Sequence, residues 1–188
     1  MNTIWVKAFA VIVGFLVVTS NVAASSDGVE LIIKRSLHKL YVKKGPDTIR
    51  SFDVALGRGG EGKLKQGDLK TPLGQYRIST MRESDRFHLF IQLNYPNMED
   101  ATRALRNKVI NRAQYRRILD AHVFQQPPPQ NTPLGGYIGI HGIGVETKQK
   151  LNIHQNIDWT EGCIALRNNE VDELSRLVQV GTPILIVD

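Results

Sequence analysis

The chain contains one cysteine, Cys163, and five histidines, so nucleophilic catalysis by a thiol is the first chemistry to consider. Gly162 precedes the cysteine, and a glycine lets the backbone approach a ligand closely. Backbone amides around a sharp turn at this point could donate hydrogen bonds to an oxyanion. A histidine brought against the thiol would stabilise the thiolate, which is the reactive form. These residue types are compatible with a Cys–His acyl-transfer enzyme, although a lone cysteine is more often a small buried packing residue.

Among the histidines, His141 is the favoured partner because it ends an apolar segment and is followed by Gly142. A side chain at the end of a strand is readily presented to a cleft. The other four are more typical of surface, half-buried or loop positions: His38, His88, His122 and His154. A metal site needs three or four clustered ligands. Only His141 and His154 lie close in sequence, without a matching carboxylate pattern, so no metal is expected.

Short strands separated by turns are the elements that must position these residues. Seven segments are expected to be strands because they are rich in β-branched and aliphatic residues: 29–34, 39–43, 49–56, 75–79, 87–93, 136–141 and 184–187. The first two predict a hairpin, with His38 in the turn. In residues 87–93, apolar residues alternate with others and predict a half-buried strand. His141 ends the sixth segment.

Helices are expected in two places. Residues 99–124 are polar and basic with interspersed apolar residues, and they predict two short helices, the second capped by Asn111. The basic stretch 103–117 is expected to be a solvated helix face rather than a binding site. Asn169 is expected to cap a C-terminal amphipathic helix. The sequence therefore predicts one mainly β domain with a short helical insertion and a C-terminal helix.

The first residues have the pattern of a cleaved secretion signal, covering residues 1–24. Lys7 precedes an uncharged apolar run over residues 8–19, and small residues follow it up to Ala24. The run is shorter than the roughly 20 residues that span a bilayer, so no stable membrane span is expected after cleavage. An uncleaved anchor is the alternative. The protein is thus expected to be exported, to the periplasm or the cell-wall space, as one domain over residues 29–187.

The chain is basic, with a net charge of +6 and a sequence pI of about 9.5. An exported basic protein favours an anionic partner such as a wall polymer or a lipid surface. Nucleic acid is not expected as a partner outside the cytoplasm. The glycine-rich residues 57–62 lack the Gly-Lys-Ser/Thr ending of a phosphate-binding loop, which argues against nucleotide binding.

Several blocks of the sequence resemble the L,D-transpeptidase (YkuD-like) family. His141-Gly142 followed by Thr160-Glu161-Gly162-Cys163-Ile164 is similar to the family signature of a His, a spacer, then Ser/Thr-His-Gly-Cys and an apolar residue. Four further blocks are similar to the family pattern: Leu40-Tyr41-Val42, 52–57, 70–76 and 181–184. The resemblance extends over residues 29–187 and implies a β-sandwich of the L,D-transpeptidase type.

The resemblance implies a role for each matching residue. Cys163 matches the nucleophile, His141 the residue that activates it, and the Gly142 carbonyl the group that orients the imidazole. Gly162 and the Cys163 amide match the oxyanion stabilisers. Neither a cofactor nor a metal is implied. Three further residues are candidates for substrate contact, with core packing, a turn cap and solvent as their respective alternatives: Trp159, Thr160 and Arg167.

The activity implied is that of a cysteine acyltransferase in peptidoglycan synthesis, cell-wall biogenesis and cell shape. Cys163 would form a thioester with the position-three residue of a tetrapeptide stem and pass it to an amine. The amine would belong to a second stem peptide or to a wall-attached protein. Hydrolysis is the alternative, as an L,D-carboxypeptidase or an amidase that releases stem peptides or wall-protein links. A non-catalytic wall-binding module is a third hypothesis.

The chain departs from the family pattern at two positions. Glu161 stands where the family often has His, and Ala165 stands where it often has Arg or Asn. A carboxylate beside a thiol favours the protonated form, so Glu161 is expected to raise the pKa of Cys163. Residues 84–133 are expected to form the insertion that shapes the acceptor side.

Overall fold

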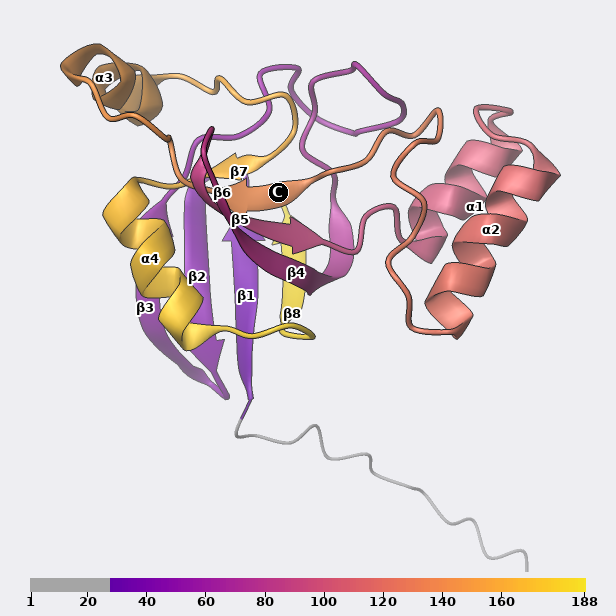
Figure 1. The fold of residues 1–188 in the computed structure, drawn as a ribbon, viewed down its shortest axis with the longest axis horizontal. Helices are drawn as coiled ribbons and strands as arrows, with labels where there is room; N and C mark the ends of the chain where they lie inside the picture. Colours follow the sequence, from indigo (N-terminus) through magenta and orange to yellow (C-terminus); the bar gives the residue numbers. More distant parts are fainter. Residues whose placement is uncertain (1–27) are drawn as a thin grey trace, which may run out of the picture.

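Eight strands of residues 28–188, the part of the chain that the computed structural model describes, form one curled sheet (Figure 1). The expected signal over residues 1–24 lies outside the described residues. The strand order is β3-β2-β1-β8-β4-β5-β6-β7, with β1–β8 and β6–β7 parallel and the other pairs antiparallel. The strands are β1 (Val29–Lys34), β2 (Lys39–Lys44), β3 (Asp47–Asp53), β4 (Gly74–Ser84), β5 (His88–Leu93), β6 (Gly139–His141), β7 (Ile164–Ala165) and β8 (Pro183–Val187).

The N-terminal hairpin of β1 and β2 confirms the prediction from sequence, and β8 closes against β1. The third strand ends at Asp53 rather than at residue 56, so the expected range 49–56 was wrong at both ends. The reason is a change of partner after Asp53. Ala55 exchanges two backbone hydrogen bonds with Ala165, of 3.1 and 2.8 Å, so this segment follows β7 instead of β2.

The β4–β5 hairpin is longer and more buried than the sequence indicated. β4 continues to Ser84, five residues beyond the expected end at Ser79. The prediction of a half-buried β5 was wrong, because its last four residues are buried on both faces. Phe90 and Gln92, which alternate with the apolar residues of this segment, are buried as well, and the Phe90 ring packs against that of His141 with centroids 6.2 Å apart.

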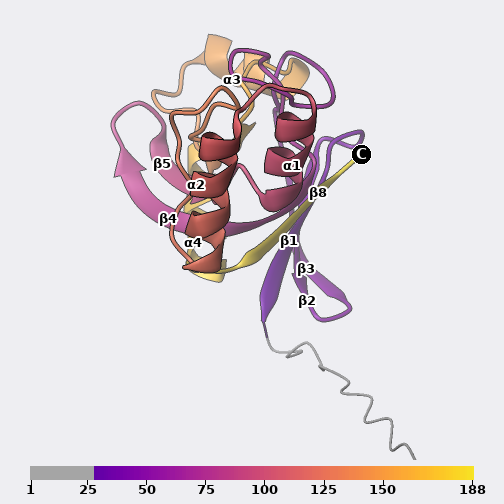
Figure 2. The same cartoon turned by 90° about the vertical axis from the view of Figure 1, so that its right-hand side faces the viewer.

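Two helices, α1 (Met98–Arg106) and α2 (Arg112–Val123), form a lobe beside the sheet (Figures 1 and 2). Both predicted helices are confirmed, as is Asn111 as the cap of the second. The lobe has a small core of its own around Ala101, Ile118 and Leu134. Because β5 is an internal strand of the sheet, the helical insertion begins after Leu93 rather than at residue 84.

The C-terminal helix α4 (Asn168–Leu177) is confirmed, but its cap was predicted wrongly. The N-cap is Arg167 rather than Asn169, and the Arg167 amide donates to the Glu170 carboxylate at 3.0 Å. The side chain of Asn168 is bonded to the backbone of Gly144, with distances of 3.2 and 2.7 Å, and the helix begins two residues earlier than a cap at Asn169 implies.

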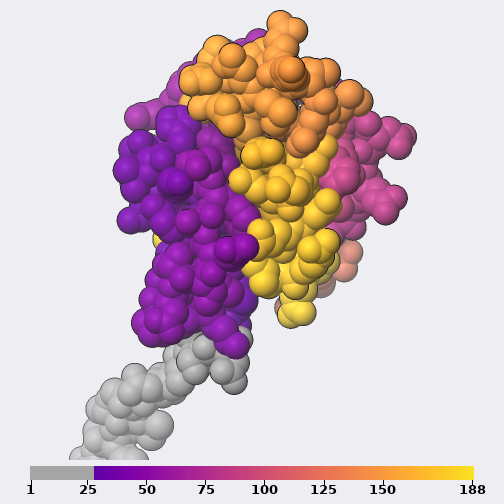
Figure 3. Space-filling view, turned by 90° about the vertical axis from the view of Figure 1, so that its left-hand side faces the viewer, coloured from indigo at the N-terminus to yellow at the C-terminus, as the bar shows by residue number. Residues whose placement is uncertain are grey.

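A fourth helix, α3 (Lys148–Asn156), occupies a stretch that was predicted to be a polar loop. His154 therefore lies on a helix and is buried, not in a loop. The helix has few apolar residues and is mostly exposed, so no hydrophobic period marked it in the sequence. Figure 3 shows the α3 segment above α4, with the N-terminal strands on one side and the β4–β5 region on the other.

The main core lies between the sheet and α4. It contains the inward-facing aliphatic residues of β1, β2, β8 and β5, together with Val171 and Leu174 of α4. No helix within residues 28–188 combines the length and the apolar character that crossing a membrane requires.

Candidate active site

The parallel pair β6–β7 brings His141 and Cys163 together. Ile140 lies opposite Ile164 and His141 opposite Ala165, so Cys163, just before β7, lies beside Gly139. Because side chains alternate between faces along a strand, His141 and Cys163 are diagonal neighbours on one face of the sheet. Both line the same cleft, whose volume is about 730 Å³. The fold thus brings together the two residues that the sequence singled out.

The imidazole of His141 is held in one tautomer by the adjacent carbonyl. Its Nδ1 lies 2.7 Å from the Gly142 oxygen, and since a carbonyl only accepts, Nδ1 carries the proton. Nε2 is then free to accept a proton. Burial, with 2% of the residue exposed, lowers the pKa of His141 to about 4, so the ring is neutral near pH 7. The geometry is that of a general base.

Three aromatic rings surround His141. The ring centroids of Phe87 and Phe90 lie 4.2 and 6.2 Å from that of the imidazole, and Trp159 meets it edge-on at 5.9 Å. Trp159 also contacts His154, because its Nε1 donates a hydrogen bond to the His154 Nδ1 at 3.4 Å. These rings exclude water from the imidazole and hold its plane, and burial among them is the main cause of its low pKa.

The loop that carries Cys163 is shaped by the hydroxyl of Thr160. This hydroxyl donates to the Cys163 carbonyl at 2.7 Å and accepts from the Gly162 amide at 3.2 Å. The Gly162 amide is therefore already bonded, so it is not a free donor for an oxyanion in this structure. Among the described residues, the amide of Cys163 has no such partner and is the available donor.

Gly162 is required by both conformation and space. Its φ is +127°, which side-chain-bearing residues rarely adopt, and a Cβ would lie 2.7 Å from the Lys70 carbonyl. Gly57 packs from the other side, where a Cβ would lie 3.0 Å from the Gly162 Cα. The Gly57 amide in turn donates to the Thr71 hydroxyl at 2.8 Å. The segments that contain Gly57 and Thr71 thus support the cysteine loop.

The thiol of Cys163 is a weak acid in this environment. Burial raises the pKa of Cys163 to about 11, the Gly139 amide and the nearby Lys63 lower it, and the Glu161 carboxylate raises it. The expected effect of Glu161 on the pKa of the thiol is confirmed. The thiol donates to the Tyr137 carbonyl at 3.5 Å. Both groups are therefore neutral near pH 7.

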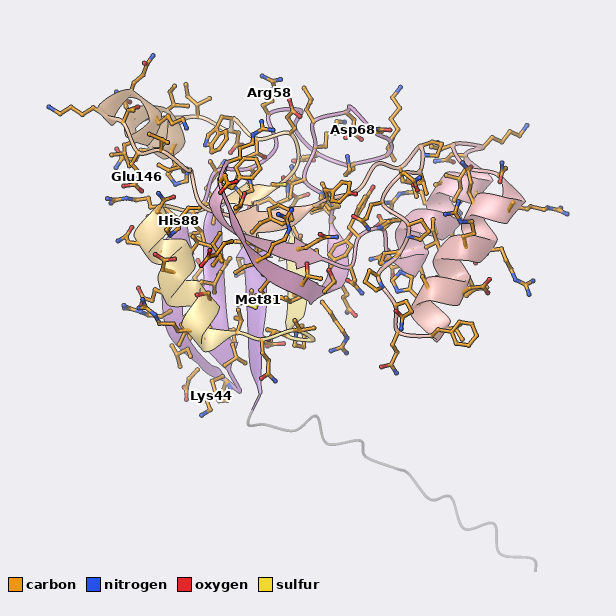
Figure 4. The ribbon with its side chains drawn as sticks, viewed as in Figure 1. Lys44, Arg58, Asp68, Met81, His88 and Glu146 are labelled. Atoms are coloured by element: carbon orange, nitrogen blue, oxygen red, sulfur yellow. The ribbon has the colours of Figure 1, made fainter. Side chains whose placement is uncertain are left out.

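The cleft around the pair is lined with cations. Arg58, Lys63, Arg82 and Arg86 face it, and Glu161 is the one carboxylate on its wall among the described residues. Arg58 projects from the loop at the edge of the molecule (Figure 4). Residues 84–133 contribute to the cleft only through their two ends, because α1 and α2 do not line it. This part of the cleft wall is formed by the tip of the β4–β5 hairpin and by residues 130–131, not by the helices.

The candidates for substrate contact fall in two places. Trp159 and Thr160 line the cleft, although the Thr160 hydroxyl is used within the loop. Arg167 lines a different pocket of about 560 Å³, shared with His38, His154 and Asp158. The tertiary structure therefore does not place Arg167 in the cleft with Cys163. Across residues 28–188, no three His, Cys, Asp or Glu side chains gather in a way that could hold a metal ion.

Sequence reasoning missed the groups that set the local environment. The Tyr137 carbonyl and the Gly139 amide contact the thiol through the backbone, which residue type does not reveal. Nothing in the sequence distinguished Phe87 and Phe90 from other strand residues. Asp158 could have been noticed in the sequence, because it directly precedes Trp159. Its carboxylate accepts from the Leu56 amide at 2.7 Å and contacts the His38 Nε2 at 3.0 Å.

Comparison with known proteins agrees with this geometry. Residues 28–186 match the model of the YkuD family, the L,D-transpeptidase catalytic domain. The chain therefore belongs to this family. No match was found among curated proteins.

Solved structures show the same fold at low sequence identity. Bd1075 from Bdellovibrio bacteriovorus is 20% identical with a TM-score of 0.52, over 85% of this chain and 48% of its own. The L,D-transpeptidase from Xylanimonas cellulosilytica is 14% identical with a TM-score of 0.50, over 87% and 62%. The helical cell shape determining protein Pgp2 from Campylobacter jejuni is 20% identical with a TM-score of 0.53, over 85% and 47%. The matched region thus spans about half to three fifths of these proteins. The expected mainly β fold of the L,D-transpeptidase type is confirmed.

Proposed function

We propose that this protein is an exported peptidoglycan L,D-transpeptidase that works through a thioester on Cys163. The observation that carries the proposal is the diagonal placement of Cys163 and His141 in one cleft, with the His141 Nδ1 held by the Gly142 carbonyl. Membership of the family supplies the substrate class, which is the stem peptides of the wall. The donor would be a tetrapeptide stem, attacked at its position-three carbonyl.

The first half-reaction transfers the acyl group to sulfur. Nε2 of His141 takes the thiol proton while sulfur attacks the carbonyl carbon, and the Cys163 amide stabilises the resulting oxyanion. The intermediate collapses with cleavage of the C–N bond. The imidazolium returns the proton to the leaving nitrogen, so D-alanine departs and a thioester remains.

The second half-reaction regenerates the thiol. An amine from a second stem peptide or from a wall-attached protein loses a proton to His141 and attacks the thioester carbonyl. The C–S bond breaks, and sulfur regains the proton from the imidazolium. Water in place of the amine would release the tripeptide stem, which is the hydrolytic alternative. No step needs a cofactor.

Intact-mass measurement tests the proposal directly. The purified protein is incubated with a tetrapeptide stem dimer and, separately, with a carbapenem, whose strained lactam acylates nucleophiles. An adduct is expected on the parent protein and not on Cys163→Ala, and the products from the stem separate transfer from hydrolysis. A folded parent protein that forms neither adduct nor product would contradict the proposal and favour a wall-binding role.

A further inference from the structure

Two exposed arginines of the β4–β5 hairpin, Arg82 and Arg86, lie on the wall of the catalytic cleft. The Arg86 Cζ lies 4.8 Å from the ring centroid of Phe87, and the Arg82 Cζ lies 5.1 Å from that of Phe90. Each guanidinium is therefore held over an aromatic face. Among the residues that the structure describes, neither guanidinium forms an ion pair or a hydrogen bond.

The other two cations of the cleft differ in this respect. Lys63 is buried and lies 2.9 Å from the Asp68 carboxylate, so its charge is compensated. Arg58 lies 3.8 Å from Glu161, the carboxylate on the cleft wall. Two positive charges are thus left free to meet an anionic ligand, and both come from one hairpin.

The rings beneath these arginines fix their place relative to the catalytic pair. Phe87 and Phe90 both pack against the His141 imidazole, with centroids 4.2 and 6.2 Å away. The guanidinium groups therefore lie on the side of the cleft that His141 forms. The charge of Arg86 also lowers the pKa of both His141 and Cys163, which agrees with its lying close to the pair.

In the proposed reaction, His141 returns a proton to the leaving nitrogen, so the leaving residue lies against His141. The α-carboxylate of that residue is joined to the same Cα as the nitrogen. We propose that Arg82 and Arg86 form a carboxylate subsite for the free terminus of the stem peptide, an inference that rests on the proposed function. A guanidinium suits this ligand because its fork of donors matches the two oxygens of a carboxylate.

The subsite lets the enzyme select stem peptides that have a free terminal carboxylate. A donor with a free terminal carboxylate binds more tightly than the same peptide with a terminal amide, because the amide lacks the charge. Hydrogen bonds to charged groups change affinity by about 10- to 100-fold. A stem peptide also carries a carboxylate on the side chain of its diamino acid, and the experiment must separate the two sources.

Binding to Cys163→Ala, measured by calorimetry, provides the test without turnover. Three tetrapeptides are compared: the free acid, the terminal amide, and a peptide amidated on the diamino acid. The free acid is expected to bind at least about tenfold more tightly than the terminal amide. Adding Arg82→Gln and Arg86→Gln should remove that difference. Arg106→Gln on α1, an exposed arginine outside the cleft, serves as the matched control and should retain it.

Each outcome has a definite meaning. Discrimination that persists in the double arginine variant overturns the proposal. An arginine-dependent loss of affinity on amidation of the diamino acid instead overturns the assignment to the terminal carboxylate. Acylation of the parent Cys163 is measured in parallel. Discrimination without acylation contradicts the proposed reaction alone, whereas acylation without discrimination contradicts the subsite alone.

Discussion

At the scale of single residues, the candidate site contains two groups that are both neutral near pH 7, and the proposed reaction requires a proton to pass between them. Burial lowers the pKa of His141 to about 4 and raises that of Cys163 to about 11. A preformed thiolate–imidazolium pair would require the opposite order of the two pKa values. In the proposed reaction the imidazole is a general base that acts when substrate arrives, and its low pKa extends the pH range over which it can accept a proton.

The pH dependence of acylation follows from this assignment. Protonated His141 cannot accept the thiol proton. The acylation rate should therefore fall as the pH is lowered, with a midpoint near pH 4, the pKa of His141 in the folded protein, and not near the ordinary value of 6.5. The rate of carbapenem acylation, followed by intact mass between pH 3.5 and pH 8 within the range where the fold is retained, measures the midpoint. A midpoint above about pH 6 would contradict a buried neutral base.

The Thr160 hydroxyl gives a second prediction at this scale. Thr160→Val keeps the shape of the side chain but leaves the Cys163 carbonyl and the Gly162 amide without their partner. We expect a loss of about 1–3 kcal/mol in the free energy of unfolding and slower acylation, because the cysteine loop loses its constraint. Urea unfolding and acylation rates measure both effects. Thr160→Ser, which keeps the hydroxyl, is the control and should restore both.

At the scale of elements, the sheet positions His141 and Cys163, the candidate catalytic pair, and the surrounding segments supply its environment. β6 and β7 have few residues but set the register of His141 and Cys163. The residues just after β3 pair with β7 and support it from the other side. The helical lobe is joined to the sheet by a buried polar contact, in which the Tyr76 hydroxyl of β4 donates to Asp100 of α1 at 2.9 Å.

That contact predicts how firmly the lobe is attached. Tyr76→Phe leaves the buried Asp100 carboxylate without one of its donors, so the free energy of unfolding should fall by about 1–3 kcal/mol. Tyr41→Phe on β2 is the control, because its hydroxyl has no hydrogen-bond partner among the described residues, and it should change the value by less than about 0.5 kcal/mol. Equal effects for the two variants would contradict a structural role for the contact.

At the scale of the whole molecule, the positive charge favours an anionic partner. The net charge is +6, and the cleft itself carries more cations than carboxylates. The exposed arginines of α1 and α2 add to this field on the lobe beside the sheet, as expected of a solvated basic helix face. Long-range attraction of this kind raises encounter rates and is weakened by salt.

Retention on purified wall material should therefore depend on ionic strength. We expect Cys163→Ala to bind at about 0.05 M salt and to be released progressively towards about 0.5 M, where the screening length is a few ångströms. Arg112→Gln with Arg117→Gln removes two charges from the lobe and should lower the salt concentration for release. Retention that does not change with salt would show that the contact is not electrostatic.

Much of the fold could be predicted from local pattern. The β1–β2 hairpin, both insertion helices and the Asn111 cap follow from residue type and spacing over a few positions. The exposed α3 and the true cap of α4 could not be found in this way. The first has few apolar residues to mark a helical face, and the second depends on a contact with Gly144, 24 residues away.

For the site, the sequence by itself singled out the thiol, a candidate histidine partner and the glycine beside the thiol, because residue types that can do this chemistry are few in this chain. Only the tertiary structure decided the protonation state of these groups and which residues surround them. Burial by Phe87, Phe90 and Trp159 sets the pKa of His141, and Arg167 lines another pocket although it is four residues from Cys163. Burial and the direction of a side chain arise from contacts between segments far apart in the chain, which no local pattern records.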